Sequence, residues 1–264
     1  MKNLVLNISA SLLFAGITAF GQSVTKSELR TVQNSAFKKG EVLDYVVSYG
    51  FVNAAKASLK VTNDDKMINK RSTYHVVGEG KTLGGFNWFF KVDDRYESYI
   101  DKEALLPWYF IRKVREGGFK LDRRISFDHY ANKATIEKDK YTINENTHDL
   151  MSAFYFCRTL DLQNAKMDEV YTIPTFFDKE NYPLRIKFLG REEVKTDVGT
   201  VRCLKFRPLL QEGRVFKEEE DMTIWISDDV NKVPVRLKTE LLIGSLKMDL
   251  VSYSSLMGAL ALVK

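Results

Sequence analysis

Few residues of this chain have the type and spacing that chemistry requires. Three histidines, His75, His129 and His148, lie far apart, and none has a partner at the spacing of metal ligands. Cys157 follows His148 by nine residues, which is more than two helical turns and too far for the imidazole to activate the thiol. The sequence holds neither a nucleophile elbow nor a phosphate-binding glycine loop. We therefore predict no catalytic residue, no metal site and no cofactor, in a protein that is not an enzyme.

Neighbouring acidic residues are the remaining candidates for acid–base chemistry. They are Asp93-Asp94, Asp228-Asp229 and the run 218–221. Paired carboxyl groups can work as general acid and general base. An aspartate in a turn more often accepts hydrogen bonds from the backbone of that turn, so we interpret these acids as turn residues.

Binding chemistry has better candidates, in the segment GGFNWFFKVDDRYESY and at one arginine. The aromatic residues that follow the two glycines could pack in an ordinary core, or could line the mouth of an apolar cavity that binds acyl or polyprenyl chains. The arginine could anchor a helix to a strand carboxylate, or could meet the anionic head of a ligand. These candidate ligand-binding residues are Phe86, Trp88, Phe89, Phe90 and Arg158.

Strands with one buried and one exposed face must position these residues. In EVLDYVVSYG, Leu43, Tyr45 and Val47 fall on one side while Asp44 and Ser48 fall on the other. This alternation is typical of antiparallel strands. About a dozen strands must curve or fold over to protect their edges, so we predict a mainly β protein whose antiparallel curved sheets form an open or partly closed barrel. The expected strands are 43–49, 55–62, 72–79, 96–100, 107–115, 119–128, 170–177, 184–189, 201–207, 222–226, 233–243 and 245–253.

One helix is expected near residues 148–160. Asn146 or Thr147 could act as its N-cap, and Asp149 would then lie in the first turn, where the helix dipole favours a negative charge. We expect this helix to lie across the sheet as a lid or to connect two halves of the chain. The apolar residues that recur at helical spacing are Leu150, Phe154, Cys157 and Leu160.

Two segments, ESYIDKEALLPWYFIRKV and TIWISDDVNKVPVRLKTEL, follow one pattern. In each, a strand ends at acidic residues, turns, and restarts with a proline, Pro107 or Pro234. Proline is tolerated at the first position of a strand. We predict two hairpins of the same design. Chance reuse of a common hairpin and an internal duplication of the chain both explain the likeness, and both stay open.

The first residues have the pattern of a secretory signal peptide. A single Lys2 precedes a long apolar run that ends at Ala19-Phe20-Gly21. We predict a signal peptide over 1–21, cleavage near Gly21, and a periplasmic or secreted mature chain without a transmembrane span. A polar lead-in over 22–36, one large β-rich domain over 37–254 and a C-terminal tail over 255–264 would follow. That domain could consist of two similar halves joined by the 148–160 helix.

Charge and cysteine content add two limits. The formal net charge of +5 is modest and its cations are scattered, so we predict no nucleic-acid partner. Cys157 and Cys203 both lie in apolar segments. They could form a disulfide in an oxidising compartment or stay as two buried thiols, and the sequence does not decide between these states.

Several segments together resemble a family of secreted bacterial proteins, domain of unknown function 3108. They are FKKGEVLDYVVSYGFVNAAKASLKV, WFFKVDDRYESYIDKEALLPWYFIRKVREGG, DLMSAFYFCR and IWISDDVNKVPVRL, which cover most of residues 37–250 in order. The resemblance implies no known activity. The hairpin with an acidic turn and a proline is also similar, at the level of fold, to one in periplasmic lipoprotein carriers, whose half-open barrel surrounds an apolar cavity under a helical lid.

Two functional hypotheses follow. The first is a non-catalytic periplasmic protein that binds a lipid or another hydrophobic molecule in an apolar groove. The second is a structural or assembly factor of the cell envelope, which would bind another protein through an exposed sheet edge or through the basic strand around Arg112, Lys113 and Arg115.

Overall fold

The computed structural model describes residues 28–86, 91–209, 222–241 and 244–263. The predicted signal peptide, residues Trp88, Phe89 and Phe90, and the acidic run 218–221 lie outside these residues. The described strands and the helix are β1 (Val42–Tyr49), β2 (Val52–Val61), β3 (Lys66–Ile68), β4 (Arg71–Thr82), β5 (Asp93–Asp101), β6 (Pro107–Glu116), β7 (Phe119–Asp128), β8 (Lys133–Ile136), β9 (Asp139–Thr142), α1 (Leu150–Cys157), β10 (Val170–Phe177), β11 (Glu180–Thr196), β12 (Gly199–Pro208), β13 (Met222–Ser227), β14 (Pro234–Glu240) and β15 (Ser245–Ser254).

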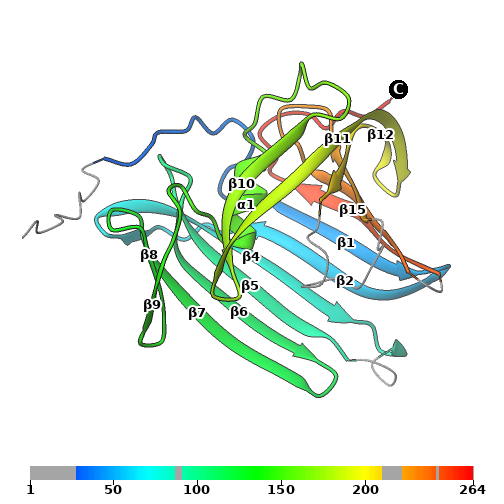
Figure 1. Ribbon diagram of the computed structural model, residues 1–264. Coiled ribbons are helices and arrows are strands. Elements are labelled where there is room, and N and C mark those ends of the chain that lie inside the picture. The colour runs from blue at the N-terminus through cyan, green and yellow to red at the C-terminus, as the bar shows by residue number, and fades with distance from the viewer. Residues whose placement is uncertain (1–27, 87–90, 210–221, 242–243, 264) are drawn as a thin grey trace, which may run out of the picture.

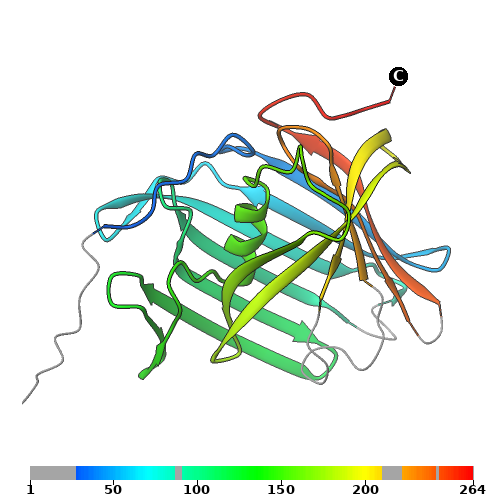
Figure 2. The same ribbon diagram turned by 45° about the horizontal axis from the view of Figure 1, so that its top comes forward.

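All of these strands join one antiparallel sheet that does not close into a barrel. The order is β10-β11-β12-β13-β14-β15-β1-β2-β4-β5-β6-β7-β8-β9, and β3 pairs with β4 outside this path. The edge strands β9 and β10 are consecutive in the chain, but the segment between them carries α1 across the concave side of the curved sheet (Figures 1 and 2). The prediction of an open antiparallel barrel with one helix is therefore confirmed.

Helix α1 fills part of the concave face. Its Met151 lies so close to Gly78 of β4 that a Cβ atom at this glycine would stand 3.2 Å from the Met151 Cε. A side chain at position 78 would require the Met151 and Leu59 side chains to shift. Met151 and Tyr155 also belong to the largest buried apolar cluster, together with Phe37, Phe110 and Phe127.

The sequence located the helix but assigned its cap and its buried face wrongly. The N-cap is Asp149, whose side chain accepts the Ser152 amide, not Asn146 or Thr147. The chain stays extended up to this point because His148 forms a parallel bridge with Thr175 of β10. Leu150, expected on the buried face, is 36% exposed, whereas Met151, Ser152, Ala153 and Tyr155 are buried. Nearly every position of α1 is apolar, so spacing alone could not identify the packed side.

The two proline hairpins share a register shift and an aspartate that accepts turn amides, although the second turn is one residue longer. Ile100 pairs with Pro107 and Ile226 pairs with Pro234, and in both the register shifts just before the isoleucine. Each turn is organised by an aspartate. Asp101 accepts the Glu103 and Ala104 amides, and Asp229 accepts the Asn231 amide at 2.8 Å. The interpretation of Asp228-Asp229 as a turn pair is confirmed, whereas Asp93 and Asp94 belong to strand β5. Internal duplication stays a prediction.

The turns of an antiparallel sheet alternate between its two ends, and these ends differ. We call one end the hairpin rim; it holds the β1–β2 and β6–β7 turns and the adjoining ends of β14 and β15 (Figure 1). We call the other end the packed end; it holds the two proline turns, the lead-in and the C-terminal tail. Within the lead-in, the Val32 amide bonds the Glu103 carbonyl, and in the tail Leu260 and Ala261 are buried. Of the residues that the structure describes, none forms a helix long and apolar enough to cross a membrane.

Candidate functional site

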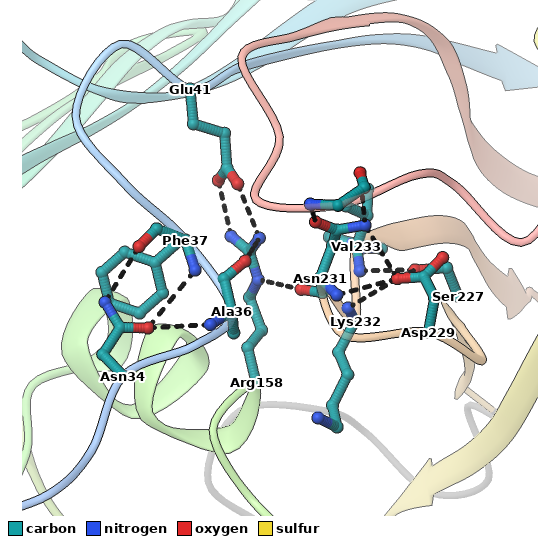
Figure 3. A network of polar contacts seen from close by, with 12 residues as sticks. Asn34, Ala36, Phe37, Glu41, Arg158, Ser227, Asp229, Asn231, Lys232 and Val233 are labelled. Atoms are coloured by element: carbon teal, nitrogen blue, oxygen red, sulfur yellow. Dashed lines mark hydrogen bonds and ion pairs between the residues drawn. The ribbon is translucent and has the colours of Figure 1, made fainter.

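Arg158 lies at the C-cap of α1 and is the centre of a buried polar network at the packed end (Figure 3). Its two terminal nitrogens bind the carboxylate of Glu41, just before β1, at 2.6 and 2.8 Å. Its Nε donates to the Asn231 carbonyl at 2.9 Å and an Nη donates to the Ala36 carbonyl at 3.1 Å. Of the two roles considered for Arg158, the structure shows the contact with a carboxylate, and binding to the head of a ligand stays untested.

This network ties four segments of the chain together. Glu41 is completely buried and Arg158 is 1% exposed. Burial alone would lower the pKa of the guanidinium, but the hydrogen bond and charge of Glu41 outweigh it and raise the pKa. A bidentate pair of this kind is directional as well as strong. It therefore fixes α1 to the lead-in, to β1 and to the second proline turn.

The N-terminal end of α1 is held by a second buried carboxyl group. Asp149 accepts the Ser98 hydroxyl of β5 at 2.6 Å and the Ser152 amide at 2.8 Å. Burial raises the pKa of Asp149 to about 6, and the hydrogen bonds with Ser98, Ser152 and Met151 oppose this rise. The helix is thus attached to the sheet at both of its ends.

His75 lies apart from the other two histidines, whereas His129 and His148 both lie near Arg30. His75 bonds Glu97 at 2.8 Å and stacks on Tyr99. His129 contacts the Pro107 carbonyl at 2.6 Å, and burial lowers its pKa to about 4. His148 accepts a hydrogen bond from Arg30 at 2.8 Å, and burial together with that cation lowers its pKa well below the usual value. The described residues contain no group of three or more His, Cys, Asp and Glu side chains that could hold a metal ion.

Both cysteines are free thiols. Cys203 is buried, and the residue Cys157 as a whole is half-buried. Burial raises the pKa of each thiol to about 12. Of the two states considered from the sequence, the structure shows the separate thiols. A thiol with so high a pKa stays protonated near neutrality and is a poor nucleophile.

The predicted site residues are not brought together. Phe86 is half-buried in the connection between β4 and β5, which lies on the hairpin-rim side of the sheet, whereas Arg158 lies at the packed end. Three of the four aromatic candidates lie outside the described residues. An aromatic portal formed by Phe86, Trp88, Phe89 and Phe90 stays a prediction.

A belt of charged side chains crosses the concave face between α1 and the hairpin rim. Arg112 of β6 and Arg123 of β7 are cross-strand neighbours, and both contact Asp178 of the β10–β11 turn, at 3.4 and 2.6 Å. The Arg112 guanidinium also lies over the rings of Tyr96 and Phe177. Its Nε is buried and has no hydrogen-bond partner among the described residues. We define the belt as Asp94, Tyr96, Arg112, Glu116, Arg123 and Asp178.

A carboxyl pair forms the rim side of this belt. Glu116 shares a hydrogen bond with Asp94, and burial followed by the influence of Asp94 raises the Glu116 pKa. Asp94 also accepts the Arg115 amide at 2.9 Å. A neighbouring carboxylate disfavours a second negative charge, which is why the Glu116 pKa is raised. The belt can therefore present cationic donors, beside a carboxyl group whose pKa is raised, to a polar group.

Apolar side chains next to the belt are incompletely covered. Ala57 of β2 and Gly80 of β4 are cross-strand neighbours on the concave side, and both are half-buried. A Cβ atom at Gly80 would meet nothing within 4 Å, in contrast to Gly78 two residues earlier. Among the described residues, Met151 therefore fills the space above the sheet at Gly78, and no atom fills it at Gly80. Other half-buried apolar residues of this face are Val47, Ala55, Leu121, Leu237 and Met248.

Two grooves share residues with this face: Leu121 and Arg123 line one, and Ala57 and Gly80 line the other. One, of about 640 Å³, follows the edge of β7 and is lined by residues that include Arg123, Asp139 and Lys179. The other, of about 500 Å³, lies mainly on the outer face of β1, β2 and β4, with Lys56 and Glu79 in its lining. Charged side chains line both grooves, so neither is the apolar cavity that the sequence predicts.

Sequence reasoning missed the belt, although one signal pointed to it. The apolar face of β7 is interrupted by Arg123 alone, and such a charge on an inward face needs a partner. Asp178, the partner, comes from a turn far away in the chain, which periodicity could not locate. No pattern marked Glu116 or the open space at Gly80.

Comparison with known proteins gives a family and a fold. The family model described as "Protein of unknown function (DUF3108)" matches residues 44–251, which is more than half of the chain. None of the curated proteins with which the sequence was compared matches it. The family description names no reaction and no ligand.

The similar solved structures are distant in sequence. A β-barrel-like protein of domain of unknown function 1849 from Brucella abortus has a TM-score of 0.52 and 8% identity, with 86% of this chain and 98% of that chain covered. A protein from Parabacteroides distasonis named as a candidate lipoprotein has a TM-score of 0.38 and 11% identity, covering 86% of this chain and 100% of its own. At these identities the first likeness shows the barrel-like fold alone, and the second, at its TM-score, adds nothing further.

Proposed function

The chain belongs to the DUF3108 family, and from that premise we propose that it is a non-catalytic, exported protein of the periplasm that binds a lipid-like amphiphile on the concave face of its open sheet. One observation carries the proposal: between α1 and the hairpin rim, half-buried apolar residues lie beside a belt of charged side chains. A surface that is apolar on one side and charged on the other matches a molecule with a tail and a polar head.

The tail would lie over β4 at Gly80, where a Cβ atom would meet nothing within 4 Å, beside Ala57 of β2. The head would meet Arg112, whose Nε lacks a partner among the described residues. A buried donor without a partner costs about 1–3 kcal/mol, so a head group that accepts its hydrogen bond gains that energy on binding. The predicted aromatic contacts, Phe86, Trp88, Phe89 and Phe90, would extend the apolar surface toward the rim.

Filling the open space above β4 tests this proposal. The probe is parinaric acid, a fluorescent fatty acid, titrated into the purified full chain. Gly80→Leu places a side chain in the proposed tail position and should weaken binding at least tenfold. Ser58→Leu is the matched control, because Ser58 belongs to the outer face of neighbouring β2 and should bind as the wild type does. No binding by the wild type, or equal binding by both variants, would overturn the proposal.

A second candidate function rests on the edge of β7. Strand β8 pairs only with Ile125–Asp128 of β7, so residues 119–124 have β6 on one side and no described strand on the other. Such an edge can accept an extended segment of another protein, as expected of an envelope assembly factor. Cross-linking in the native envelope should then capture a protein partner, and mass spectrometry should find no stoichiometric lipid. The amphiphile proposal expects the reverse.

A further inference from the structure

The hairpin rim exposes two phenylalanines to solvent. Phe51, in the β1–β2 turn, is completely exposed, and Phe119, at the β6–β7 turn, is 56% exposed. Tyr49 and Val52, which flank the first turn, are exposed as well, and so is Leu246 at the start of β15, the strand that pairs with β1. Single exposed apolar residues are common, but here the exposed phenylalanines of the described chain both lie at the same end of the sheet.

Basic residues surround the second of these tips. Arg115 and Lys120 are exposed cross-strand neighbours beside Phe119. Lys91 is exposed in the adjoining segment, where its carbonyl accepts the Gly117 amide at 2.8 Å. None of these three cations forms an ion pair within the part of the chain that the structure describes. The acidic residues of this tip contact other side chains: Glu116 forms a hydrogen bond with Asp94, and Asp122 forms an ion pair with Arg124.

We propose that the hairpin rim docks on an anionic lipid surface, with Phe51 and Phe119 entering the boundary between headgroups and acyl chains. The inference rests on the proposed function, because an amphiphile held on the concave face must enter or leave from a lipid phase. Protruding aromatics flanked by lysine and arginine are the composition that interfacial binding requires. Unpaired cations at the same level add attraction to anionic headgroups.

The two tips are separated along the same end of the sheet. Four strand-to-strand steps separate the two turns along the sheet, or about 20 Å at roughly 4.8 Å per step. Two protruding contacts at this distance would set the orientation of the sheet on a flat surface. The concave face opens at the same rim, so docking would bring the belt and the space at Gly80 toward the membrane.

Flotation with lipid vesicles tests the docking. The wild-type chain should float with vesicles of phosphatidylcholine and phosphatidylglycerol (7:3) and at least tenfold less with phosphatidylcholine alone. The double variant F51S/F119S should lose at least tenfold of the binding to the anionic vesicles. R115E/K120E should lose binding to a similar extent, and added salt should weaken the wild type. The matched control is Met67→Ser, which removes a 65%-exposed apolar side chain near the other end of the sheet and should float as the wild type does.

Three results would overturn the docking. They are a wild type that does not float, an F51S/F119S variant that floats normally, and loss of a cross-linked dimer in that variant, which would assign the tips to a second copy of the chain. Parinaric acid binding keeps this test separate from the proposed function, because F51S/F119S should bind the probe normally. Loss of vesicle binding with retained probe binding supports the docking. A wild type that floats but does not bind the probe would overturn only the proposed function.

Discussion

At the packed end of the sheet, charged groups are buried against one another, whereas at the hairpin rim aromatic groups are exposed to solvent. Arg158, Glu41 and Asp149 are completely or almost completely buried and are all hydrogen-bonded. Phe51 has the opposite character, being apolar and fully exposed. Burying a charge and exposing an aromatic ring both cost free energy. At the packed end, hydrogen bonds and ion pairs within the chain offset this cost, and at the rim we propose that contact with a lipid surface offsets it.

The contrast separates stability from function. The contacts that hold α1, the lead-in and the second proline turn together gather at the packed end, and the open concave surface lies toward the rim. Substitutions at the packed end should therefore change the free energy of unfolding, and substitutions at the rim should change binding. The four predictions below test this separation.

Removal of the Glu41 carboxylate should have the largest effect. In Glu41→Ala, Arg158 stays buried without its counterion, and breaking a buried pair in this way costs about 3–5 kcal/mol of stability. Urea unfolding measures the loss. The double variant Glu41→Leu with Arg158→Met should be more stable than Glu41→Ala, because it leaves no unpaired charge. A loss below about 1 kcal/mol in Glu41→Ala would contradict the assignment of this network as the main attachment of α1.

Acid should weaken the packed end through its buried histidines. The folded-state pKa of His129, about 4, lies below the usual 6.5. The unfolded chain therefore takes up this proton first, and the stability present above pH 6.5 is lost as the pH falls toward 4. For His129 the loss is at most about 3 kcal/mol. Unfolding free energies at pH 7 and pH 4.5 should differ less in His129→Phe than in the wild type, although the variant loses the hydrogen bond to Pro107. An equal difference in both proteins would contradict the prediction.

Asp149 should make the protein less stable as the pH rises, which is the opposite of the effect expected of His129. Its folded-state pKa of about 6 exceeds the usual 3.8, so its contribution is complete below pH 3.8 and is lost as the pH rises through 6. Asparagine keeps the N-cap without the charge. Asp149→Asn should therefore gain up to about 3 kcal/mol at pH 8 and almost nothing at pH 4. Asp149→Ala, which also loses the cap, should be about 1 kcal/mol less stable than Asp149→Asn at both pH values. A loss in Asp149→Asn that grows from pH 4 to pH 8 would show instead that the carboxylate is favourable in the folded state.

The sequence was sufficient for the strands and the open barrel because alternation is a local property. Leu43, Tyr45 and Val47 face one way wherever the strand lies, and the two prolines mark strand starts in any context. Strands β8 and β9, four residues each, were too short for alternation to reveal.

The site was less predictable because its contacts join segments far apart in the chain. Arg158 was identified as an anchor or a ligand contact, but its partner Glu41 lies before β1 and carries no local signature. Asp178 reaches the arginines of the belt only because the β10–β11 turn crosses the concave face. The cap of α1 was misplaced for a similar reason, since His148 is held extended by β10.

The smallest effect on stability is expected at the rim. Phe51→Ser should change the free energy of unfolding by less than about 0.5 kcal/mol, because the side chain makes no buried contact that is lost. The same substitution at the packed end, Phe37→Ser, removes a ring that is 1% exposed and lies against Tyr74 and Tyr155, and it should lose more than about 3 kcal/mol. Urea unfolding of both variants measures the contrast. If Phe51→Ser lost as much stability as Phe37→Ser, the tip would be part of the packed structure and the rim could not be assigned to docking.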